Sequence, residues 1–288
     1  MNWRAFAALS VAVLAISWGA PLARLTDAAP LAVAMWRTLL ATLLLAPVAV
    51  ARRGGSLPPR HRPAALLAGL LLGLHFGLWV PSLWLTSVSA SVVLVTTAPL
   101  WVLLLSPRFL GVGIRARNLA SFALAITGVA IIAWGDLHLS ARALLGDAMA
   151  LTGAVCAAGY MIVGKRLRQE VPLASYLFLV YGGAAATLVA AVVVLGVQPR
   201  PATTVAWLPL LGMAVGPMLL GHGLLNWALA HFEAYRVNLT VLLEPIEASF
   251  WTWLVIGEVP PLHVLPGAAL VLGALALEFL PRRRSTRR

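Results

Sequence analysis

The chain has 288 residues, of which 61% are apolar and 10% are charged, and its mean hydropathy is +0.93. Typical soluble domains are about 45–50% apolar and about 25% charged. This composition excludes a soluble enzyme, a nucleic-acid-binding module and a disordered chain, because too little polar surface remains to keep a globule of this length in water. Most of the chain is therefore expected to lie in lipid.

The net charge is +12, from 21 Lys and Arg against nine Asp and Glu. In a soluble protein this excess would indicate an anionic partner. Here the basic residues stand at the ends of apolar runs, where they set membrane orientation, and no nucleic-acid partner is predicted. The single cysteine, Cys156, lies inside an apolar run, so neither a disulfide framework nor a thiol metal cluster is expected. No cofactor or metal is predicted.

Ten apolar runs are long enough to cross a bilayer, which takes roughly 20 helical residues. These runs would use about 200 of the 288 residues and leave only connectors, with no room for a soluble catalytic domain. The chain is therefore predicted to be an all-α polytopic membrane protein. In chain order the runs cover residues 5–25, 30–51, 64–86, 88–107, 118–135, 142–163, 172–196, 203–230, 237–256 and 261–280.

The connectors predict the orientation. With the N-terminus in the cytoplasm, 17 basic residues fall in inside segments and three in outside segments, as the positive-inside rule requires. We therefore expect a multi-pass protein of the bacterial inner membrane with both termini cytoplasmic. A cleaved signal peptide over the first run would leave the same sidedness and is the alternative. The inside residues are Arg4, Arg52, Arg53, Arg60, Arg62, Arg108, Arg115, Arg117, Lys165, Arg166, Arg168, Arg236, Arg282, Arg283, Arg284, Arg287 and Arg288, and the outside residues are Arg24, Arg142 and Arg200.

An internal repeat divides the chain into residues 1–136 and 137–288, the second part ending in a basic cytoplasmic tail at 281–288. A shift of about 141 residues lays the first run on the sixth, which argues against cleavage of the first. Five helices per half force the second half to insert upside down, and inverted repeats of this kind are typical of secondary transporters. Chance recurrence of Gly, Ala, Leu and Pro is the alternative. A shift of 146 residues superposes Pro99 on Pro245, Gly111 on Gly257, Ala123 on Ala269 and Leu124 on Leu270.

Four stretches carry a family resemblance: Ser17–Gly19 (SWG), Trp36–Arg37 (WR), His75–Trp101 and Leu242–Glu258. They resemble the drug/metabolite transporter superfamily and, within it, the EamA-type ten-helix exporters, more loosely the aromatic amino-acid exporters. The resemblance implies two inverted five-helix repeats, a central cavity between them, and efflux of metabolites or amphipathic compounds. One departure is that the first half has Gly111–Val112 where the second half has the Gly-Glu of Gly257–Glu258.

Ionisable residues inside the runs are the first functional candidates, because charge at membrane depth is costly. Helical spacing places Thr240, Glu244, Glu247 and Trp251 on one face, which should point inward. One of the two carboxylates is expected to carry a proton. They are predicted either to couple protons or bind a cation, or to form a buried structural pair, for example with Arg37. That arginine either binds a substrate carboxylate or fixes helix packing.

Two polar faces complete the predicted site. His75, Trp79, Ser82 and Thr86 form a stripe on the third run, opposite Ala65, Gly69, Gly73 and Gly77, which suit close helix packing. His222 and Asn226 are the rough counterpart on the eighth run. Each of these histidines either contacts substrate or is satisfied by a neighbour. The predicted substrate-binding residues are Trp18, His75, Trp79, Ser82, Trp101, Tyr160, His222, Asn226 and Trp251.

Two motif matches are set aside. Gly159–Lys165 reads GxxxxGK, but Arg166 follows where Ser or Thr should ligate magnesium, and the motif ends an apolar helix rather than following a strand. The sequon at Asn238 lies at the membrane and is expected to be inert. No catalytic residues are predicted.

The sequence therefore predicts a secondary transporter that exports amino acids or small amphipathic metabolites by alternating access, with protons as a candidate coupling ion. Because both halves are present in one chain, a monomer would suffice. Two alternatives stay open. One is an intramembrane enzyme acting on a lipid, and the other is a channel without alternating states.

Overall fold

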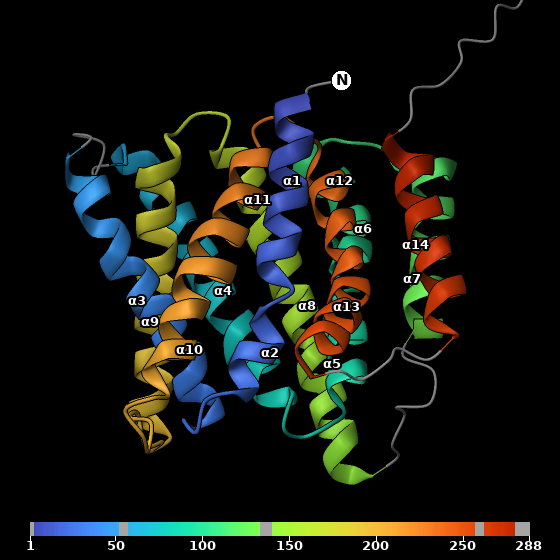
Figure 1. Ribbon diagram of the computed structural model, residues 1–288. Helices are drawn as coiled ribbons and strands as arrows, with labels where there is room; N and C mark the ends of the chain where they lie inside the picture. Colours follow the sequence, from blue (N-terminus) through green and yellow to red (C-terminus); the bar gives the residue numbers. More distant parts are fainter. Residues whose placement is uncertain (1–2, 52–56, 133–139, 257–261, 280–288) are drawn as a thin grey trace, which may run out of the picture.

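The structure is a computed structural model that describes residues 3–51, 57–132, 140–256 and 262–279 (Figure 1). Gly257, Glu258 and the predicted tail at 281–288 lie outside the described residues. Within them the chain is helical, and a short helical turn, η1 (Pro59–His61), precedes α4. The segments are α1–α2 (Trp3–Ile16, Gly19–Arg24), α3 (Pro30–Ala51), α4 (Arg62–Ser82), α5–α6 (Val88–Val95, Ala98–Leu110), α7 (Ala116–Ile132), α8 (Ala141–Leu167), α9 (Leu173–Val194), α10–η2–α11 (Trp207–Met213, Ala214–His222, Gly223–Ala228), α12–η3–α13 (Ala234–Leu239, Thr240–Leu243, Glu244–Ile256) and α14 (Val264–Phe279).

Each of the ten predicted runs has a helical counterpart in the described residues. Seven helical stretches are long and apolar enough to cross a membrane. The fifth and tenth runs form the shorter apolar helices α7 and α14, and the ninth is divided among α12, η3 and α13. The prediction of an all-helical membrane fold is therefore confirmed.

Local chemistry places several helix ends. The Ser87 side chain accepts a hydrogen bond from the Ala90 N–H at the start of α5, and Ser140 does the same for Ala143 at the start of α8. Such caps satisfy N–H groups that have no partner within the helix. Helix α6 ends at Gly111, whose φ of 68° is readily available only to glycine.

Small residues set how closely the helices approach, and α4 packs against both α8 and α9. A Cβ atom built on Gly69 would lie 2.8 Å from the carbonyl oxygen of Val180 on α9. The predicted glycine stripe of α4 is thus a packing face. At the opposite edge of the bundle α7 lies beside α14 (Figure 1). There a Cβ on Gly128 would come within 2.5 Å of the Gly267 carbonyl oxygen, so the two backbones touch.

Four segments are interrupted: the first, fourth, eighth and ninth. The fourth breaks at Thr96–Thr97 and the ninth passes through the 3₁₀ turn η3. Under the 146-residue shift Thr96 corresponds to Leu242, so the two breaks occupy equivalent places in the repeat. Pro99 and Pro245 follow them, and each lies in the first turn of the next helix, where a missing N–H costs least. Discontinuous helices in equivalent repeats typically flank a transporter's binding site.

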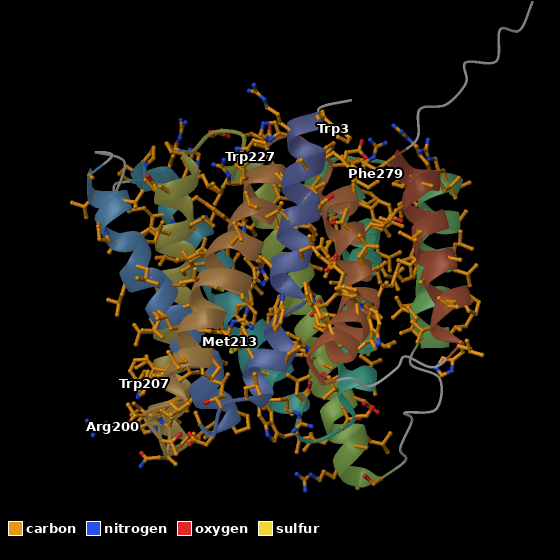
Figure 2. All side chains as sticks on the ribbon, in the orientation of Figure 1. Trp3, Arg200, Trp207, Met213, Trp227 and Phe279 are labelled. Atoms are coloured by element: carbon orange, nitrogen blue, oxygen red, sulfur yellow. The ribbon has the colours of Figure 1, made fainter. Side chains whose placement is uncertain are left out.

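The bundle has two chemically different ends. Trp3 and Phe279 lie at one end and Arg200 and Trp207 at the other, here named the Trp3 end and the Arg200 end (Figure 2). At the Arg200 end the Asp27 carboxylate accepts hydrogen bonds from the Ala202 N–H at 2.8 Å and the Thr203 hydroxyl at 2.7 Å. Tryptophans at both ends match the aromatic belts of membrane interfaces.

The Trp3 end joins the basic connectors to one another. Arg60 and Glu170 form an ion pair at 3.3 Å. The Lys165 ammonium donates to the carbonyl oxygens of Leu229 and Phe232, each at 2.8 Å. These contacts tie the C-terminal end of α8 to the connector that follows α11.

Candidate functional site

A cavity of about 60 Å³ lies between the helices of the bundle. Residues of α1, α4, α8 and α11 line it, together with the interrupted parts of the fourth and ninth segments. Thr96 and Ala98 border it from the first break, and Val241 and Glu244 from the second. Space of this size admits a few water molecules, whereas ligand pockets usually measure about 300–1,000 Å³. The cavity is therefore smaller than an ordinary ligand pocket.

The cavity wall carries buried polar atoms that have no hydrogen-bond partner within the described part of the chain. They are the Trp79 indole N–H, His222 Nδ1, the Asn238 amide nitrogen and one Glu244 carboxylate oxygen. A buried polar atom left unpaired costs about 1–3 kcal/mol. Four such atoms around one cavity provide a ready set of donors and acceptors for a polar ligand.

His75 lines the cavity with a defined orientation. Its Nδ1 lies 3.0 Å from the Gly153 carbonyl oxygen of α8. Because a carbonyl oxygen only accepts, Nδ1 carries the hydrogen, and Nε2 of the neutral ring is an acceptor. The ring stacks on Trp79 with centroids 5.8 Å apart. His75 is therefore held by a neighbour on one side and keeps one nitrogen for another contact.

Arg37 lies next to this cavity and is 1% exposed. Its guanidinium carbon stands 4.1 Å from the ring centroid of Phe76, the chain neighbour of His75. Nε and Nη1 have no hydrogen-bond partner within the described residues. The predicted structural pair with Glu244 does not form: these two described side chains interact electrostatically but make no ion pair within 4.0 Å.

Glu247 belongs to a second group beside the cavity, around the break in the first segment. The Trp251 indole N–H donates to the Ser17 hydroxyl at 2.9 Å, and the Glu247 carboxyl also interacts with Ser17. The Trp18 and Trp251 rings lie 4.7 Å apart. Glu244 thus borders the cavity, while Glu247, Trp18 and Trp251 gather at the α1–α2 junction.

The remaining predicted site residues lie either at the cavity, like Tyr160, or outside its wall, like Ser82 and Trp101. Tyr160 lines the cavity, and its hydroxyl accepts a hydrogen bond from the Asn226 amide, which also donates to the His222 carbonyl oxygen. Ser82 instead pairs with Ser91 at 2.6 Å and links α4 to α5. The Trp101 indole N–H is buried without a partner in the described chain, away from the cavity wall. Their role in binding stays a prediction.

One expected face is wrong. Thr240 and Glu244 were predicted to share a helical face, but Thr240 borders an apolar groove on the flank of the bundle and Glu244 borders the cavity. The reason is η3, because a 3₁₀ turn rotates roughly 120° per residue and an α-helix roughly 100°. Over four residues the difference is about 80°.

Sequence reasoning missed Asn238 on the cavity wall and Phe76, which lies beside the cavity but is not part of its wall. Phe76, which carries the Arg37 guanidinium, reads as ordinary apolar bulk. Asn238 is part of a sequon, and its spacing of six from Glu244 matches no α-helical face; the two line one wall because the 3₁₀ turn η3 lies between them.

Glu278 is a missed buried carboxylate at the Trp3 end, 1% exposed. It pairs with the Arg236 guanidinium at 3.1 Å and accepts hydrogen bonds from Asn118 at 3.2 Å and Ser121 at 3.3 Å. This group ties α7, α12 and α14 together. The sequence did offer a signal for Glu278, because it is an acidic residue in the last turn of a helix. The helix dipole disfavours a negative charge at that end unless a cation is near.

A second hollow, of about 430 Å³, opens at the Trp3 end between α6, α8 and α12. The same segments continue to the central cavity. On α8, Met161 lines the cavity and Lys165 lines the hollow, and on α12 the corresponding residues are Asn238 and Ala234. Four residues of helix span about 6 Å, so roughly one helical turn separates the two spaces.

A bundle of apolar helices that encloses an unsatisfied polar cavity between two equivalent helix breaks defines a membrane transporter. The chain belongs to the EamA-like transporter family, whose model matches residues 1–134 and 144–280. These two stretches fall one in each predicted repeat, whose bounds at 136 and 137 stay a prediction.

One curated protein and one solved structure are similar to this chain. The chain is similar to the "Uncharacterized transporter YdfC" of Bacillus subtilis (strain 168), with 26% identity over 252 residues, 86% of this chain and 81% of the relative. A solved structure described as "Crystal structure of protein" has the same fold, with a TM-score of 0.80, 17% identity and 97% of each chain covered.

Proposed function

We propose that this transporter exports amino acids or similarly small amphipathic metabolites by alternating access, with both termini in the cytoplasm of a bacterial inner membrane. The observation that carries the proposal is a set of four polar atoms on the cavity wall that have no partner among the described residues, on Trp79, His222, Asn238 and Glu244. A cavity that bound only lipid tails would not keep such atoms, because each is costly to bury unpaired. In this orientation the Trp3 end faces the cytoplasm.

The charges beside the cavity favour a zwitterionic substrate. The Arg37 guanidinium and the Glu244 carboxyl group interact electrostatically and are not paired with each other. A substrate carboxylate would fit the two open donors of Arg37, since a guanidinium binds carboxylates through parallel N–H groups. A substrate ammonium would fit the open oxygen of Glu244, and the Trp79 indole would cover the apolar part of the molecule.

Glu244 and Glu247 are the proposed proton-coupling residues. Both belong to the ninth segment immediately after η3, and each has one oxygen without a partner in the described chain. Release of a proton from Glu244 when a substrate ammonium arrives, and its return when the substrate leaves, would link export to proton entry. The alternative source of energy is the concentration gradient of the substrate itself across the membrane.

Reconstituted counterflow tests the proposal. Proteoliposomes loaded with candidate amino acids are expected to exchange labelled substrate faster than empty liposomes. Glu244→Gln is expected to lower the exchange roughly tenfold or more, because one charge-assisted hydrogen bond contributes about 1.5–3 kcal/mol. The control is Glu170→Gln, which changes an exposed carboxylate at the Trp3 end and should transport like the parent.

Two outcomes would contradict the proposal. Exchange no faster than in empty liposomes for the whole panel, with modified lipid products accumulating, would favour the intramembrane enzyme. Glu244→Gln and Glu247→Gln proteins that transport with unchanged pH dependence would show that the two carboxylates are structural.

A further inference from the structure

The hollow at the Trp3 end has the size of an ordinary ligand pocket. Its volume is about 430 Å³, and such pockets usually measure about 300–1,000 Å³. It lies between the C-terminal ends of α6 and α8 and the start of α12. The charged residues among its described lining are Arg108, Lys165, Arg166 and Glu233. Three cations against one carboxylate in that lining favour a ligand with an anionic group.

Several neutral polar groups of the hollow are already engaged. The Ser106 hydroxyl donates to the Val102 carbonyl oxygen at 2.6 Å. The Tyr235 hydroxyl donates to the Asn118 carbonyl oxygen at 2.8 Å, and the Asn118 amide donates to the Glu278 carboxylate at 3.2 Å. Recognition of a ligand therefore depends on the charged side chains.

Two of the three cations keep donors for a ligand. The Lys165 ammonium has three N–H groups, and two of them donate to the carbonyl oxygens of Leu229 and Phe232, each at 2.8 Å. The third is left without a partner among the described residues. Arg108 is exposed, and its N–H groups have no hydrogen-bond partner in the described part of the chain. The Arg166 guanidinium, in contrast, donates to a backbone carbonyl oxygen of α6.

Glu233 brings a carboxylate to the same hollow. It interacts electrostatically with Lys165, but these two described side chains make no ion pair within 4.0 Å. Its contact with Arg236 Nε, at 3.7 Å, is looser than the bond of 3.1 Å that this nitrogen makes to another carboxylate. An unpaired cation and carboxyl group thus border the hollow, as the Arg37 guanidinium and the Glu244 carboxyl group do beside the central cavity.

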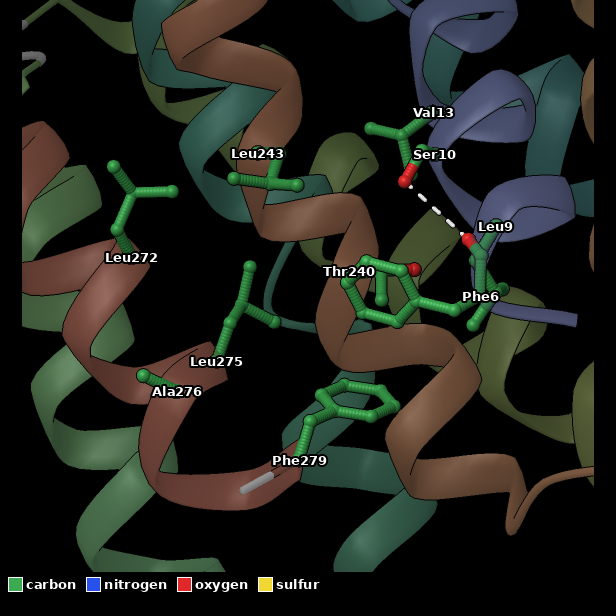
Figure 3. A pocket seen from close by; sticks show the side chains of 10 residues that line it. All are labelled: Phe6, Leu9, Ser10, Val13, Thr240, Leu243, Leu272, Leu275, Ala276 and Phe279. Carbon is green, nitrogen blue, oxygen red and sulfur yellow. Dashed lines mark hydrogen bonds between the residues drawn. The ribbon is translucent and has the colours of Figure 1, made fainter. Parts of the chain in front are cut away.

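The apolar groove on the flank of the bundle, between α1, η3 and α14, lacks these features (Figure 3). Its hydroxyl groups are bonded within their own segments. Ser10 donates to the Phe6 carbonyl oxygen at 3.3 Å, and Thr240 donates to the Val237 carbonyl oxygen at 2.7 Å. The described lining of the groove includes no charged side chain. The groove therefore offers nothing to the charged ends of a small metabolite.

We propose that the hollow is a docking site for a zwitterionic metabolite, whose carboxylate binds Arg108 and Lys165 and whose ammonium group binds Glu233. Charge-assisted hydrogen bonds of this kind are among the strong ones. Leu110 and Val112 supply apolar surface for the rest of the molecule. From the hollow the ligand moves roughly one helical turn to reach the central cavity. The class of ligand rests on the proposed function, but occupancy of the hollow is measurable without transport.

Protection of a single cysteine from a water-soluble thiol reagent measures this occupancy in the purified full chain. The cysteine is Gly113→Cys in a Cys156→Ala background, because Gly113 lines the hollow and a Cβ there meets nothing within 4 Å. Leucine is the probe, and at saturation it is expected to slow the modification roughly threefold or more. Arg4→Cys, exposed at the same end but outside the hollow, is the matched control and should react at an unchanged rate.

Two analogues of leucine separate its charges. Isocaproate lacks the ammonium group and isoamylamine lacks the carboxylate, so each should need a roughly threefold to tenfold higher concentration for half protection. Equal protection by all three compounds would overturn the proposal, because the hollow would then recognise only the apolar part. Protection by inorganic phosphate or by phosphatidylglycerol as strong as that by leucine would also overturn it, in favour of a phosphate or lipid headgroup site.

Arg108→Gln tests the carboxylate contact. It should raise the leucine concentration for half protection roughly threefold to tenfold and change little for isoamylamine. Arg115→Gln, which changes an exposed arginine at the same end outside the hollow, is the matched control. Equal shifts in the two variants would overturn the assignment, because they would reflect overall charge alone. Glu233→Gln should weaken protection by leucine and leave protection by isocaproate unchanged.

Glu244→Gln separates this inference from the proposed function. It is expected to lower counterflow while leucine still protects the cysteine in the hollow. Absence of protection in a protein with normal counterflow would overturn the docking site and leave the proposed function standing. Protection by leucine in a protein that exchanges none of the candidate amino acids would support the docking site and contradict the proposed function.

Discussion

At the scale of single residues, Arg37 is the least expected feature of the molecule. A buried arginine usually pairs with a carboxylate or with carbonyl oxygens. Arg37 instead covers the face of Phe76 at 4.1 Å and keeps Nε and Nη1 without partners in the described chain. A cation over an aromatic ring is stabilised by about 2 kcal/mol when desolvated, which offsets part of the burial cost and leaves the hydrogen-bonding donors available.

Arg37→Met is expected to raise the KM for amino acids roughly tenfold to a hundredfold, since charge-assisted hydrogen bonds contribute about 1.5–3 kcal/mol. Transport of the corresponding amine, which lacks the carboxylate, should change little. Counterflow with both compounds measures the difference. Arg200→Gln, an exposed arginine at the Arg200 end, is the control. Equal losses for acid and amine would mean that Arg37 only supports packing.

Asp27 gives a pH-dependent prediction outside the membrane. The Thr203 hydroxyl donates to its carboxylate and holds the pKa of Asp27 below its ordinary value. A lowered folded-state pKa adds stability at pH above the unfolded value of about 3.9, and this stability is lost as the pH falls through the folded pKa. The Thr203→Val protein should therefore be slightly less stable than the parent at pH 6. The difference in stability between the two proteins should disappear as the pH falls below about 4. Thermal unfolding from pH 3 to 7 measures it, and a constant difference would contradict the assignment.

Only some of the predicted site residues line the cavity, and the reason is physical. His75, Trp79, Tyr160, His222 and Glu244 line the cavity. The other predicted residues lie beside it or, like Ser82, join neighbouring helices. Spacing along a helix tells which residues share a face, but the rotation of that helix against its neighbours is decided by packing. Sequence therefore indicated candidate polar faces and left their arrangement around the cavity undetermined.

At the scale of helices, the number and order of the segments were predictable because each needs about 20 apolar residues. The interruptions within the segments could not be predicted. Pro99 and Pro245 indicate a disturbance, but whether a segment bends, stops or passes through a 3₁₀ turn depends on the surrounding helices. The π-type stretch η2 in the eighth segment, which carries Pro217 and His222, likewise had no clear signal in the sequence.

Glu278→Gln is expected to lower stability by about 1–3 kcal/mol, because the change removes the charge that faces Arg236 in a mostly buried group. Thermal unfolding in detergent measures the loss. The exposed pair of Arg60 and Glu170 provides the comparison, and Glu170→Gln should lower stability by less than about 1 kcal/mol. Equal effects of the two variants would contradict the buried role of Glu278.

Gly128→Ala tests the contact between α7 and α14. The added methyl group would lie 2.5 Å from the Gly267 carbonyl oxygen, so the helices must separate, at a cost of about 1–3 kcal/mol. Gly113→Ala adds the same group where nothing lies within 4 Å and is the matched control. Thermal unfolding of both proteins decides the matter, and a Gly128→Ala protein as stable as the control would show that α7 and α14 are not held by this contact.

At the scale of the whole molecule, the surroundings of the central cavity differ toward the two ends of the bundle. The Arg200 end is fastened by the bonds of Asp27 and by the Trp36 indole N–H, which donates to the Pro199 carbonyl oxygen at 2.6 Å. Toward the Trp3 end, about one helical turn separates the cavity from the hollow beside Lys165.

Alternating access predicts that single cysteines at the two ends of α4 and of the α10–η2–α11 segment react with an impermeant thiol reagent from one side at a time. The parent for these variants is Cys156→Ala, which removes the chain's own cysteine. Added substrate should shift reactivity between the two ends. Reactivity from both sides at once, unchanged by substrate, would favour a channel without alternating states.

The four residues of η3 have a mechanical consequence. A 3₁₀ turn rises roughly 2.0 Å per residue and an α-helix roughly 1.5 Å, so conversion of η3 into α-helix would shorten the ninth segment by about 2 Å. The same conversion would turn α12 by about 80° relative to Glu244. A change in the length of this segment is therefore coupled to a rotation of α12 about the helix axis. A small axial displacement of α12, which Arg236 anchors to Glu278, would bring Thr240 from the lipid side toward the side of Glu244.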